Sequence, residues 1–274
     1  MVVLSGIYTY PIKSCAALSH TSATIDDRGL PYDRRWMITD PDGMFFTQRE
    51  LPALALIQPG VEPDSLTLNA PGMQPMRVPL AYPGQTTRQV EVWGDVCDAW
   101  DEGDALAEWL SDYLGTKSRL VRMTDAFVRP VDPRYAPQPA RTAFSDGFPL
   151  LIVSEASLDD LNRRLAERGK QPVPMSRFRP NLVVSGSTAY AEDDWKVVTI
   201  GSVTLDVVKP CARCATTTVD QATGSVPDSA EPLATLNTYR KMNGKVYFAQ
   251  NAIHRAPGSV RIGDALQISE ASLL

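Results

Sequence analysis

Histidine is scarce in this 274-residue chain, which contains only His20 and His254. Two histidines exclude a His-rich zinc site and the HExxH helix of a metalloprotease. Neither histidine has the local sequence context of a catalytic triad, so we interpret both as surface or packing residues. The chemistry of the protein is therefore expected to depend on Cys, Lys, Arg, Asp or a cofactor.

Cysteine and long apolar segments are scarce as well. Four cysteines in a chain of this length do not make a disulfide scaffold. No segment approaches the roughly 18 apolar residues of a membrane span. The N-terminus has neither the basic region nor the long apolar region of an export signal. These absences predict a cytoplasmic protein with reduced thiols and no membrane partner.

Positive charge is not in excess, because 27 Lys and Arg face 32 Asp and Glu, for a net charge of -5. A general nucleic-acid binder is normally basic, so we expect no nucleic-acid partner. The 27 basic residues divide into 20 Arg and 7 Lys. Arginine binds phosphate and carboxylate in a bidentate manner, so this bias permits a buried anion site, although a GC-rich genome would produce the same bias.

What the chain does contain is a series of short β-type segments separated by turns, with 22 Pro and 17 Gly. Helices are predicted from Asp104 to Leu114, from a capping box at Ser157 to Gly169, and from Pro232 toward Met242. Strands are predicted at 3–10, 21–25, 35–39, 44–47, 66–68, 76–78, 89–93, 149–153, 181–184, 196–200, 203–208, 215–219, 246–248 and 260–262. This pattern predicts an α+β fold dominated by antiparallel, β-barrel-like sheets with a few helices. The irregular segment 125–148, rich in Pro and Arg, suggests domains at 1–124 and 125–270.

The most distinctive motif is Lys209-Pro210-Cys211-Ala212-Arg213-Cys214, which is expected on a turn between two strands. A thioredoxin-type CxxC would instead begin a helix, and a structural zinc site would need a second pair of ligands. Cys15 and Cys97 are too isolated to provide that pair. The charges of Lys209 and Arg213 favour the thiolate form, which binds metals or attacks electrophiles. From the local sequence, a reactive thiolate and a pair of inert thiols both remain open.

Three further segments place cations at the ends of predicted strands. They are Tyr10-Pro11-Ile12-Lys13-Ser14-Cys15, Asp33-Arg34-Arg35-Trp36 and Arg177-Phe178-Arg179-Pro180-Asn181. Each could hold an anion, and each could equally be a solvated turn, a structural ion pair or a charged strand edge. Together with the thiol turn they are more suggestive than any of them alone.

In this order, the motifs resemble those of MOSC-domain proteins preceded by the MOSC N-terminal β-barrel region. The resemblance runs from about residue 2 to about residue 269 and is strongest to bacterial hydroxylaminopurine-detoxifying members and to the mitochondrial amidoxime-reducing component. It also includes Ser145-Asp146-Gly147-Phe148-Pro149-Leu150, Ser154-Glu155-Ala156-Ser157-Leu158 and Phe248. The ordered set is far more specific than any single motif.

The resemblance implies a molybdenum cofactor, a pyranopterin dithiolene, with Cys214 as the Mo ligand and catalytic residue. Cys211 matches the cysteine that the family does not use as a ligand. The other implied cofactor contacts are Lys13, Ser14 and Arg34 to the phosphate, Arg179 and Asn181 to the pterin, and Arg213 beside the metal. At 147–149 the mitochondrial relatives carry hydroxyl residues, so no contact is transferred there.

The implied activity is reduction of hydroxylamines, amidoximes and N-hydroxylated bases, which is a detoxification. Several bacterial relatives carry an iron–sulfur domain after the MOSC domain, whereas no cysteine follows Cys214 here. We therefore expect electrons from a separate ferredoxin- or cytochrome-like protein with a flavin reductase. Two alternatives stay open: a sulfur carrier in which Cys214 holds a persulfide for delivery to a metal centre, and a binding module with structural thiols.

Overall fold

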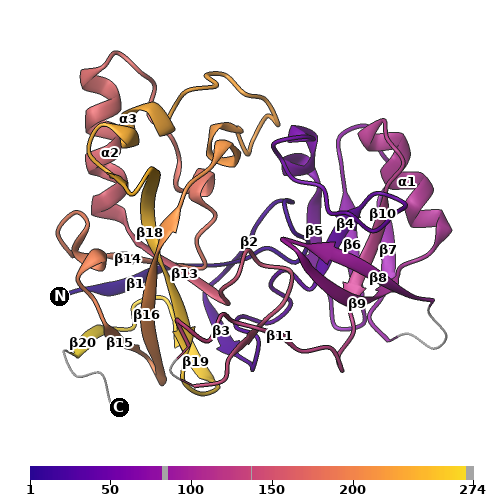
Figure 1. The fold of residues 1–274 in the computed structure, drawn as a ribbon, viewed down its shortest axis with the longest axis horizontal. Helices are drawn as coiled ribbons and strands as arrows, with labels where there is room; N and C mark the ends of the chain where they lie inside the picture. The colour runs from indigo at the N-terminus through magenta and orange to yellow at the C-terminus, as the bar shows by residue number, and fades with distance from the viewer. Residues whose placement is uncertain (82–85, 137, 270–274) are drawn as a thin grey trace.

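A computed structural model describes residues 1–81, 86–136 and 138–269 of the chain, which are arranged in two lobes (Figure 1). The described part is mostly β-strand with three α-helices, α1 (Asp104–Leu114), α2 (Glu155–Glu167) and α3 (Leu233–Asn237). The predicted α+β class with predominantly antiparallel sheets is confirmed, but the sheets are not closed into a barrel. No α-helix in the described ranges is long and apolar enough to cross a bilayer.

The first lobe is built on a nine-stranded sheet. Its order is β2 (Leu18–His20), β1 (Val3–Thr9), β14 (Leu182–Ser185), β13 (Leu150–Ser154), β18 (Lys245–His254), β16 (Val203–Ala212), β15 (Val197–Ile200) and β20 (Leu266–Ser269), with β17 (Lys241–Met242) beside β18. Only the β13–β14 pair is parallel. A two-stranded sheet of β3 (Ser22–Ile25) and β19 (Gly258–Arg261) completes the lobe.

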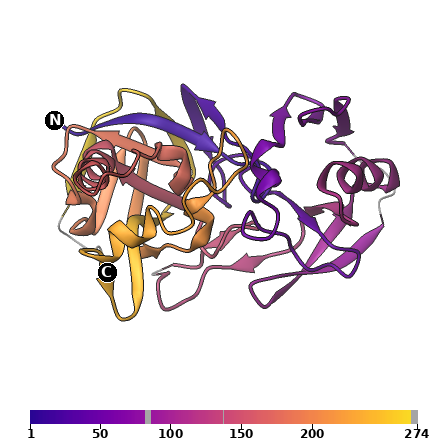
Figure 2. The ribbon, with the colours of Figure 1, turned by 90° about the horizontal axis from the view of Figure 1, so that it is seen from above.

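The N-terminal strands belong to this first lobe. β1 pairs with β14, and β3 pairs with β19, so the beginning of the chain lies among strands of its second half (Figures 1 and 2). The chain therefore enters the first lobe, builds the second and returns. The domain boundary between 124 and 125 stays a prediction.

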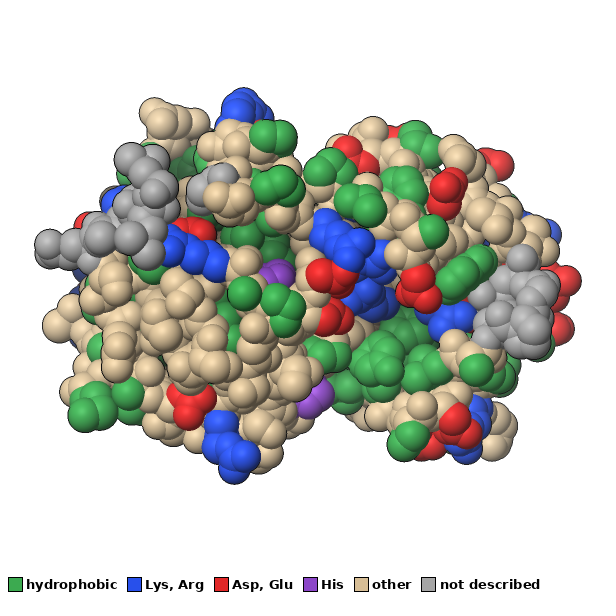
Figure 3. Space-filling model, turned by 90° about the horizontal axis from the view of Figure 1, so that it is seen from below, with side chains coloured by type: hydrophobic (Ala, Val, Ile, Leu, Met, Phe, Trp, Pro, Cys, Tyr) green, Lys and Arg blue, Asp and Glu red, His purple; other side chains and the backbone are tan. Residues whose placement is uncertain are grey.

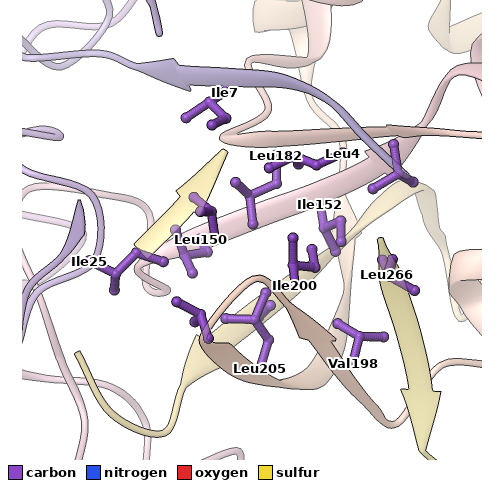
Figure 4. Close-up of a cluster of buried hydrophobic side chains, with 14 of the residues drawn as sticks. Leu4, Ile7, Ile25, Leu150, Ile152, Leu182, Val198, Ile200, Leu205 and Leu266 are labelled. Atoms are coloured by element: carbon purple, nitrogen blue, oxygen red, sulfur yellow. The ribbon is translucent and has the colours of Figure 1, made fainter. Parts of the chain in front are cut away.

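The core of the first lobe follows from strand periodicity. All five residues of β13 are buried. Because successive side chains point to opposite faces, Leu150 and Ile152 join one apolar cluster, shown in Figure 4, while Leu151 and Val153 join a second cluster with α2. A strand covered on both faces reads as a continuous apolar run, which is the sequence of β13.

The second lobe carries two smaller sheets and α1. One sheet has the order β4 (Trp36–Thr39), β10 (Arg119–Met123), β9 (Asp95–Asp101) and β8 (Thr87–Val92), and the other has the order β5 (Gln58–Val61), β6 (Ser65–Asn69) and β7 (Met76–Pro79). Leu106 and Leu110 of α1 are buried in one cluster with Trp36. The predicted bounds of α1 are confirmed.

Arginine side chains where the lobes meet form hydrogen bonds to backbone carbonyls and an ion pair. Figure 3 shows Lys, Arg, Asp and Glu side chains next to one another where the lobes meet. The buried Arg28 donates to the carbonyls of Asp125 at 2.7 Å and Phe127 at 2.9 Å. The guanidinium of Arg35 pairs with Asp26 at 2.7 Å. Between the lobes, the irregular segment predicted at 125–148 contains only the short strands β11 (Arg129–Pro130) and β12 (Arg141–Thr142) among its described residues.

Four local predictions were wrong. The helix predicted from Pro232 toward Met242 ends at Asn237, and Lys241–Met242 is instead the strand β17, paired with β18. The cap of α2 is Ser154, whose side chain accepts from the Ser157 amide, so the predicted capping box at Ser157 begins three residues too late. Residues 44–47 make only isolated bridges. The predicted strand 215–219 is instead a 3-10 helix, η4 (Ala215–Thr218), because Thr217 and Thr218 donate their hydroxyls to carbonyls three residues earlier.

Candidate functional site

All seven predicted site residues line one pocket to which both lobes contribute. Arg49 and Trp93 come from the second lobe, and the 3-10 helix η4 contributes Thr216. The seven residues are Lys13, Ser14, Arg34, Arg179, Asn181, Arg213 and Cys214. The fold therefore brings together residues as far apart in the sequence as Lys13 and Cys214. Their individual roles remain predictions.

The two cysteines of the motif differ in exposure. Cys211 is the second-to-last residue of β16 and is half-buried, whereas Cys214 follows the strand and is exposed. Burial raises the pKa of the Cys211 thiol, against the opposing charge of Arg213. The Cys214 thiol is 3.4 Å from the Thr216 hydroxyl, to which it donates. Cys214 is therefore the more accessible thiol in the pocket.

The protein side chains do not form a metal site by themselves. Within 1–81, 86–136 and 138–269, no group of three or more His, Cys, Asp or Glu is placed to hold a metal ion. A metal at Cys214 would therefore need further ligands from a cofactor. The soft thiolate suits such a redox-active transition metal.

Lys13 is a buried cation in the wall of the pocket. Its ammonium group donates to the Phe144 carbonyl at 2.9 Å and to Asp146 at 2.5 Å, and its side chain is only 6% exposed, against 79% for Asp146. Burial lowers the pKa of Lys13, and Asp146 offsets this in part. Ser14 has a φ of 68°, and its hydroxyl is 3.5 Å from the Phe46 carbonyl. Burial therefore opposes the charged form of Lys13, and the ion pair with Asp146 favours it.

Lys13→Met is therefore expected to raise the free energy of unfolding at pH 7, because it removes a desolvated cation. The loss of the ion pair with Asp146, which lowers the pKa of that carboxyl, offsets part of the gain. The native pKa of Lys13 lies below its ordinary value of 10.5, so the wild type gains stability as pH rises through that window. The difference between the two proteins should shrink there. Urea unfolding of both proteins between pH 7 and 11 measures this difference in the free energy of unfolding. A wild type that is more stable than the variant at pH 7 would contradict the prediction.

Sequence reasoning missed Tyr10, which organises two of the arginines. The guanidinium carbons of Arg34 and Arg179 each lie 4.2 Å from the centroid of its ring. Tyr10 is buried, which raises its pKa to about 12, and its neutral hydroxyl donates to the Pro180 carbonyl at 3.0 Å. The ring faces attract the cations and keep them together. The signal was the aromatic residue at the end of the first predicted strand.

The two arginines differ in how well they are paired. Arg34 binds Asp33 at 2.5 Å, and Asp33 is only 3% exposed. Arg179 donates Nη1 to the Cys15 carbonyl at 2.7 Å, but its buried Nη2 has no partner among the described residues. Desolvation lowers the pKa of Arg179 to about 10, so it remains charged at neutral pH. A buried charged donor without a partner is costly and is suited to an anion.

Asn181 and Arg213 are held by backbone groups. The side-chain amide of Asn181 accepts from the Leu151 amide and donates to the Tyr8 carbonyl, each at 3.1 Å. Arg213 donates to the carbonyls of Phe248 at 2.9 Å and Phe178 at 3.1 Å. These contacts tie together the walls of the pocket. A contact of either residue to a cofactor remains a prediction.

Trp93 was also missed. It lies at the turn between β8 and β9 in the left-handed conformation, with a φ of 55°, followed by Gly94 at 88°. Both values fit a tight two-residue hairpin. Its indole donates to Asp146 at 2.9 Å, so the second lobe contacts the segment that lies between the lobes. The Trp-Gly pair between two β-type runs was the available signal.

Comparison with known proteins identifies two domain families. The MOSC N-terminal beta barrel domain matches residues 1–117, and the MOSC domain matches residues 139–267. The mitochondrial amidoxime-reducing component 1 of Mus musculus is 39% identical over 283 residues, which cover 97% of this chain and 82% of that protein. Its counterpart from Homo sapiens is 36% identical over 282 residues, with the same shares.

A second kind of relative matches over less of its own length. The molybdenum cofactor sulfurase of Oryza sativa subsp. japonica is 33% identical over 260 residues, which cover 89% of this chain but 32% of that protein. Both kinds of relative match nearly the whole of this chain. The two family models match in the order that the sequence motifs predicted. The chain therefore belongs to the MOSC family, with a MOSC N-terminal domain preceding the MOSC domain.

Proposed function

We propose that this protein is a molybdenum-cofactor-dependent oxidoreductase that reduces N-hydroxylated compounds with electrons from a separate protein. One observation carries the proposal: the exposed thiol of Cys214 opens onto a pocket that also contains a buried donor of Arg179 with no partner in the described part of the chain. The names of the amidoxime-reducing relatives support the substrate class. We place the activity in the cytoplasm, as a detoxification.

The residues of the pocket fit an anionic cofactor that brings its own metal ligands. Lys13, Arg34 and Arg179 supply positive charge, and Arg179 has a free donor. Charge-assisted hydrogen bonds to such donors are the strong ones. Cys214 would add one thiolate to the metal, which matches the absence of any larger ligand group in the described ranges. When bound, the molybdenum cofactor supplies the two-electron redox chemistry.

The chain's own residues would then bind and orient. Lys13, Ser14 and Arg34 would hold the phosphate, Arg179 and Asn181 the pterin, and Cys214 the metal, with Arg213 beside it. Reduction of R–NHOH to R–NH2 breaks the N–O bond, consumes two electrons and two protons, and releases water. The protein has to supply a site from which bulk water is partly excluded and an entry for the substrate.

The electrons have to come from elsewhere. Besides the motif cysteines, Cys15 and Cys97 are buried in different apolar clusters, so the four thiols of the chain do not assemble an iron–sulfur centre. The sequence has no GxGxxG nucleotide motif. We propose a ferredoxin- or cytochrome-like donor served by a flavin reductase.

The purified protein is therefore expected to be inert with benzamidoxime or 6-hydroxylaminopurine when NADH is the only reductant. Reduced viologen dye should restore turnover, because it delivers electrons without a protein partner. Product formation measured by chromatography, together with Mo per chain, tests this. Turnover of the isolated chain with NADH would contradict it.

A sulfur carrier is the second candidate, favoured by the similarity to molybdenum cofactor sulfurase and by the exposure of Cys214. In that role Cys214 would hold a labile sulfane sulfur and the protein would contain little Mo. Cyanolysis of freshly purified protein, with metal analysis of the same sample, separates the two. Full Mo loading with no turnover from any artificial donor would also count against the reductase.

A further inference from the structure

A second hollow lies beside Cys214. Ala212, Arg213 and Cys214 line it as well as the first pocket, so this short segment forms a wall common to both. Its other walls come from α3 and from the β17–β18 hairpin, which lie close together in Figures 1 and 2. Of the seven predicted site residues, only Arg213 and Cys214 line this hollow among the residues described. The Cys214 thiol is therefore also accessible from outside the first pocket.

The walls of this hollow are held in place by the fold. Asn243 and Gly244 form the two-residue turn of the hairpin with φ values of 48° and 76°, as a type I′ turn requires. At the base of the hairpin, Arg240 makes two hydrogen bonds to Asp193, at 2.6 and 2.9 Å. On the other side, Leu236 anchors α3 in the core, where it is fully buried. A preformed hollow is suited to binding a small molecule.

Its lining combines an apolar surface with positive charge. Leu233 and Ala234 of α3 and Val246 of β18 are half-buried and present apolar atoms. Arg213 and the exposed Lys245 are the charged residues of the described lining, which contains no Asp or Glu. A cation entering this hollow would be repelled by both.

We propose that this hollow is the substrate entrance. It selects N-hydroxylated compounds that have an apolar scaffold with neutral or anionic substituents over those with cationic substituents. The inference rests on the proposed reductase function and adds the route and the charge selectivity. Lys245 sets the selectivity because it is exposed at the rim, whereas Arg213 is committed to the carbonyls of Phe248 and Phe178.

Steady-state kinetics with reduced viologen test the selectivity on two matched substrates, 4-carboxybenzamidoxime and 4-(aminomethyl)benzamidoxime. The wild type should have the higher kcat/KM for the carboxylate. Lys245→Glu should shift the ratio of the two values toward the cation by about tenfold, since two exposed charge interactions change sign. Lys241→Glu is the matched control, because Lys241 is exposed on the same hairpin but does not line the hollow. Equal shifts in both variants would overturn the proposal.

A second measurement does not depend on catalysis. In cofactor-free Cys211→Ser protein, Cys214 is the exposed thiol, while Cys15 and Cys97 are fully buried. A negatively charged methanethiosulfonate reagent should modify it faster than a positively charged one, and Lys245→Glu should reduce that preference more than Lys241→Glu. If this holds but Mo-loaded protein reduces no N-hydroxyl compound, the entrance stands and the proposed function fails. If turnover is present and Lys245→Glu changes neither measurement, the inference alone is wrong.

Discussion

Cys214→Ser is expected to lose N-hydroxyl reduction by more than about 100-fold, beyond the 10- to 100-fold typical of residues that only support a metal ligand. The serine hydroxyl is a poor replacement for a thiolate at a soft metal site. Because Cys214 is exposed and its thiol makes one long hydrogen bond, the fold should survive. Turnover with reduced viologen, Mo per chain and the unfolding midpoint measure the three effects.

Cys211→Ser is the matched control. It lies three residues earlier in the same motif, is half-buried, and packs against the cluster that contains Phe178 and Phe248. Burial raises the pKa of the Cys211 thiol, which disfavours its thiolate form. We expect this variant to retain most of its activity and its Mo. Equal losses in both variants would indicate a dithiol or disulfide mechanism instead.

Elements defined by strong local periodicity were predictable. The apolar spacing of α1 and the acidic residue in its first turn predicted its bounds correctly, and the apolar run of β13 predicted a buried strand. Segments whose conformation depends on side-chain to backbone hydrogen bonds were not. The β-branched residues after Cys214 favoured a strand by propensity, but their hydroxyls bond back to carbonyls and form a 3-10 turn.

Pairing between distant strands was also beyond local reasoning. Nothing near β1 indicates that it pairs with β14, since that register is determined by the apolar faces of both strands in one core. The Asn243-Gly244 hairpin is different, because Asn-Gly is itself a strong hairpin signal, although a helix was predicted up to Met242 immediately before it. Without that hairpin the hollow beside Cys214 has no second wall.

The site was predicted as a set of residues but not as an arrangement. The resemblance named seven residues, and the structure places all of them around one pocket. Their hydrogen bonds could not be read from the sequence. Asn181 and Arg213 are engaged by backbone groups, whereas Arg179 has a donor left over. Those differences determine which substitution can lower cofactor binding without also changing the free energy of unfolding.

Arg179→Ala is expected to lower Mo content sharply while the free energy of unfolding changes little. The variant loses the hydrogen bond to the Cys15 carbonyl, a long one of 3.4 Å to Gln221 and the contact with the Tyr10 ring. These losses are offset because it also removes a buried donor that has no partner in the described part of the chain. A charge-assisted bond to the cofactor is worth roughly 1.5–3 kcal/mol, about tenfold or more in affinity. Arg179→Lys should recover only part of the Mo, because an ammonium group replaces the planar fork.

Arg34→Ala should behave differently, although it also removes a cation from the same pocket. Among the described residues, it leaves the buried Asp33 carboxylate with the Tyr10 amide as its one hydrogen-bond donor, at 2.7 Å. Breaking a buried pair costs about 3–5 kcal/mol, and this retained hydrogen bond places the expected loss near the lower value. Mo analysis of purified protein, with urea unfolding of the cofactor-free form, separates binding from stability. If both Ala variants keep the Mo content of the wild type, neither arginine binds the cofactor, and the anion site has to be sought elsewhere in the pocket.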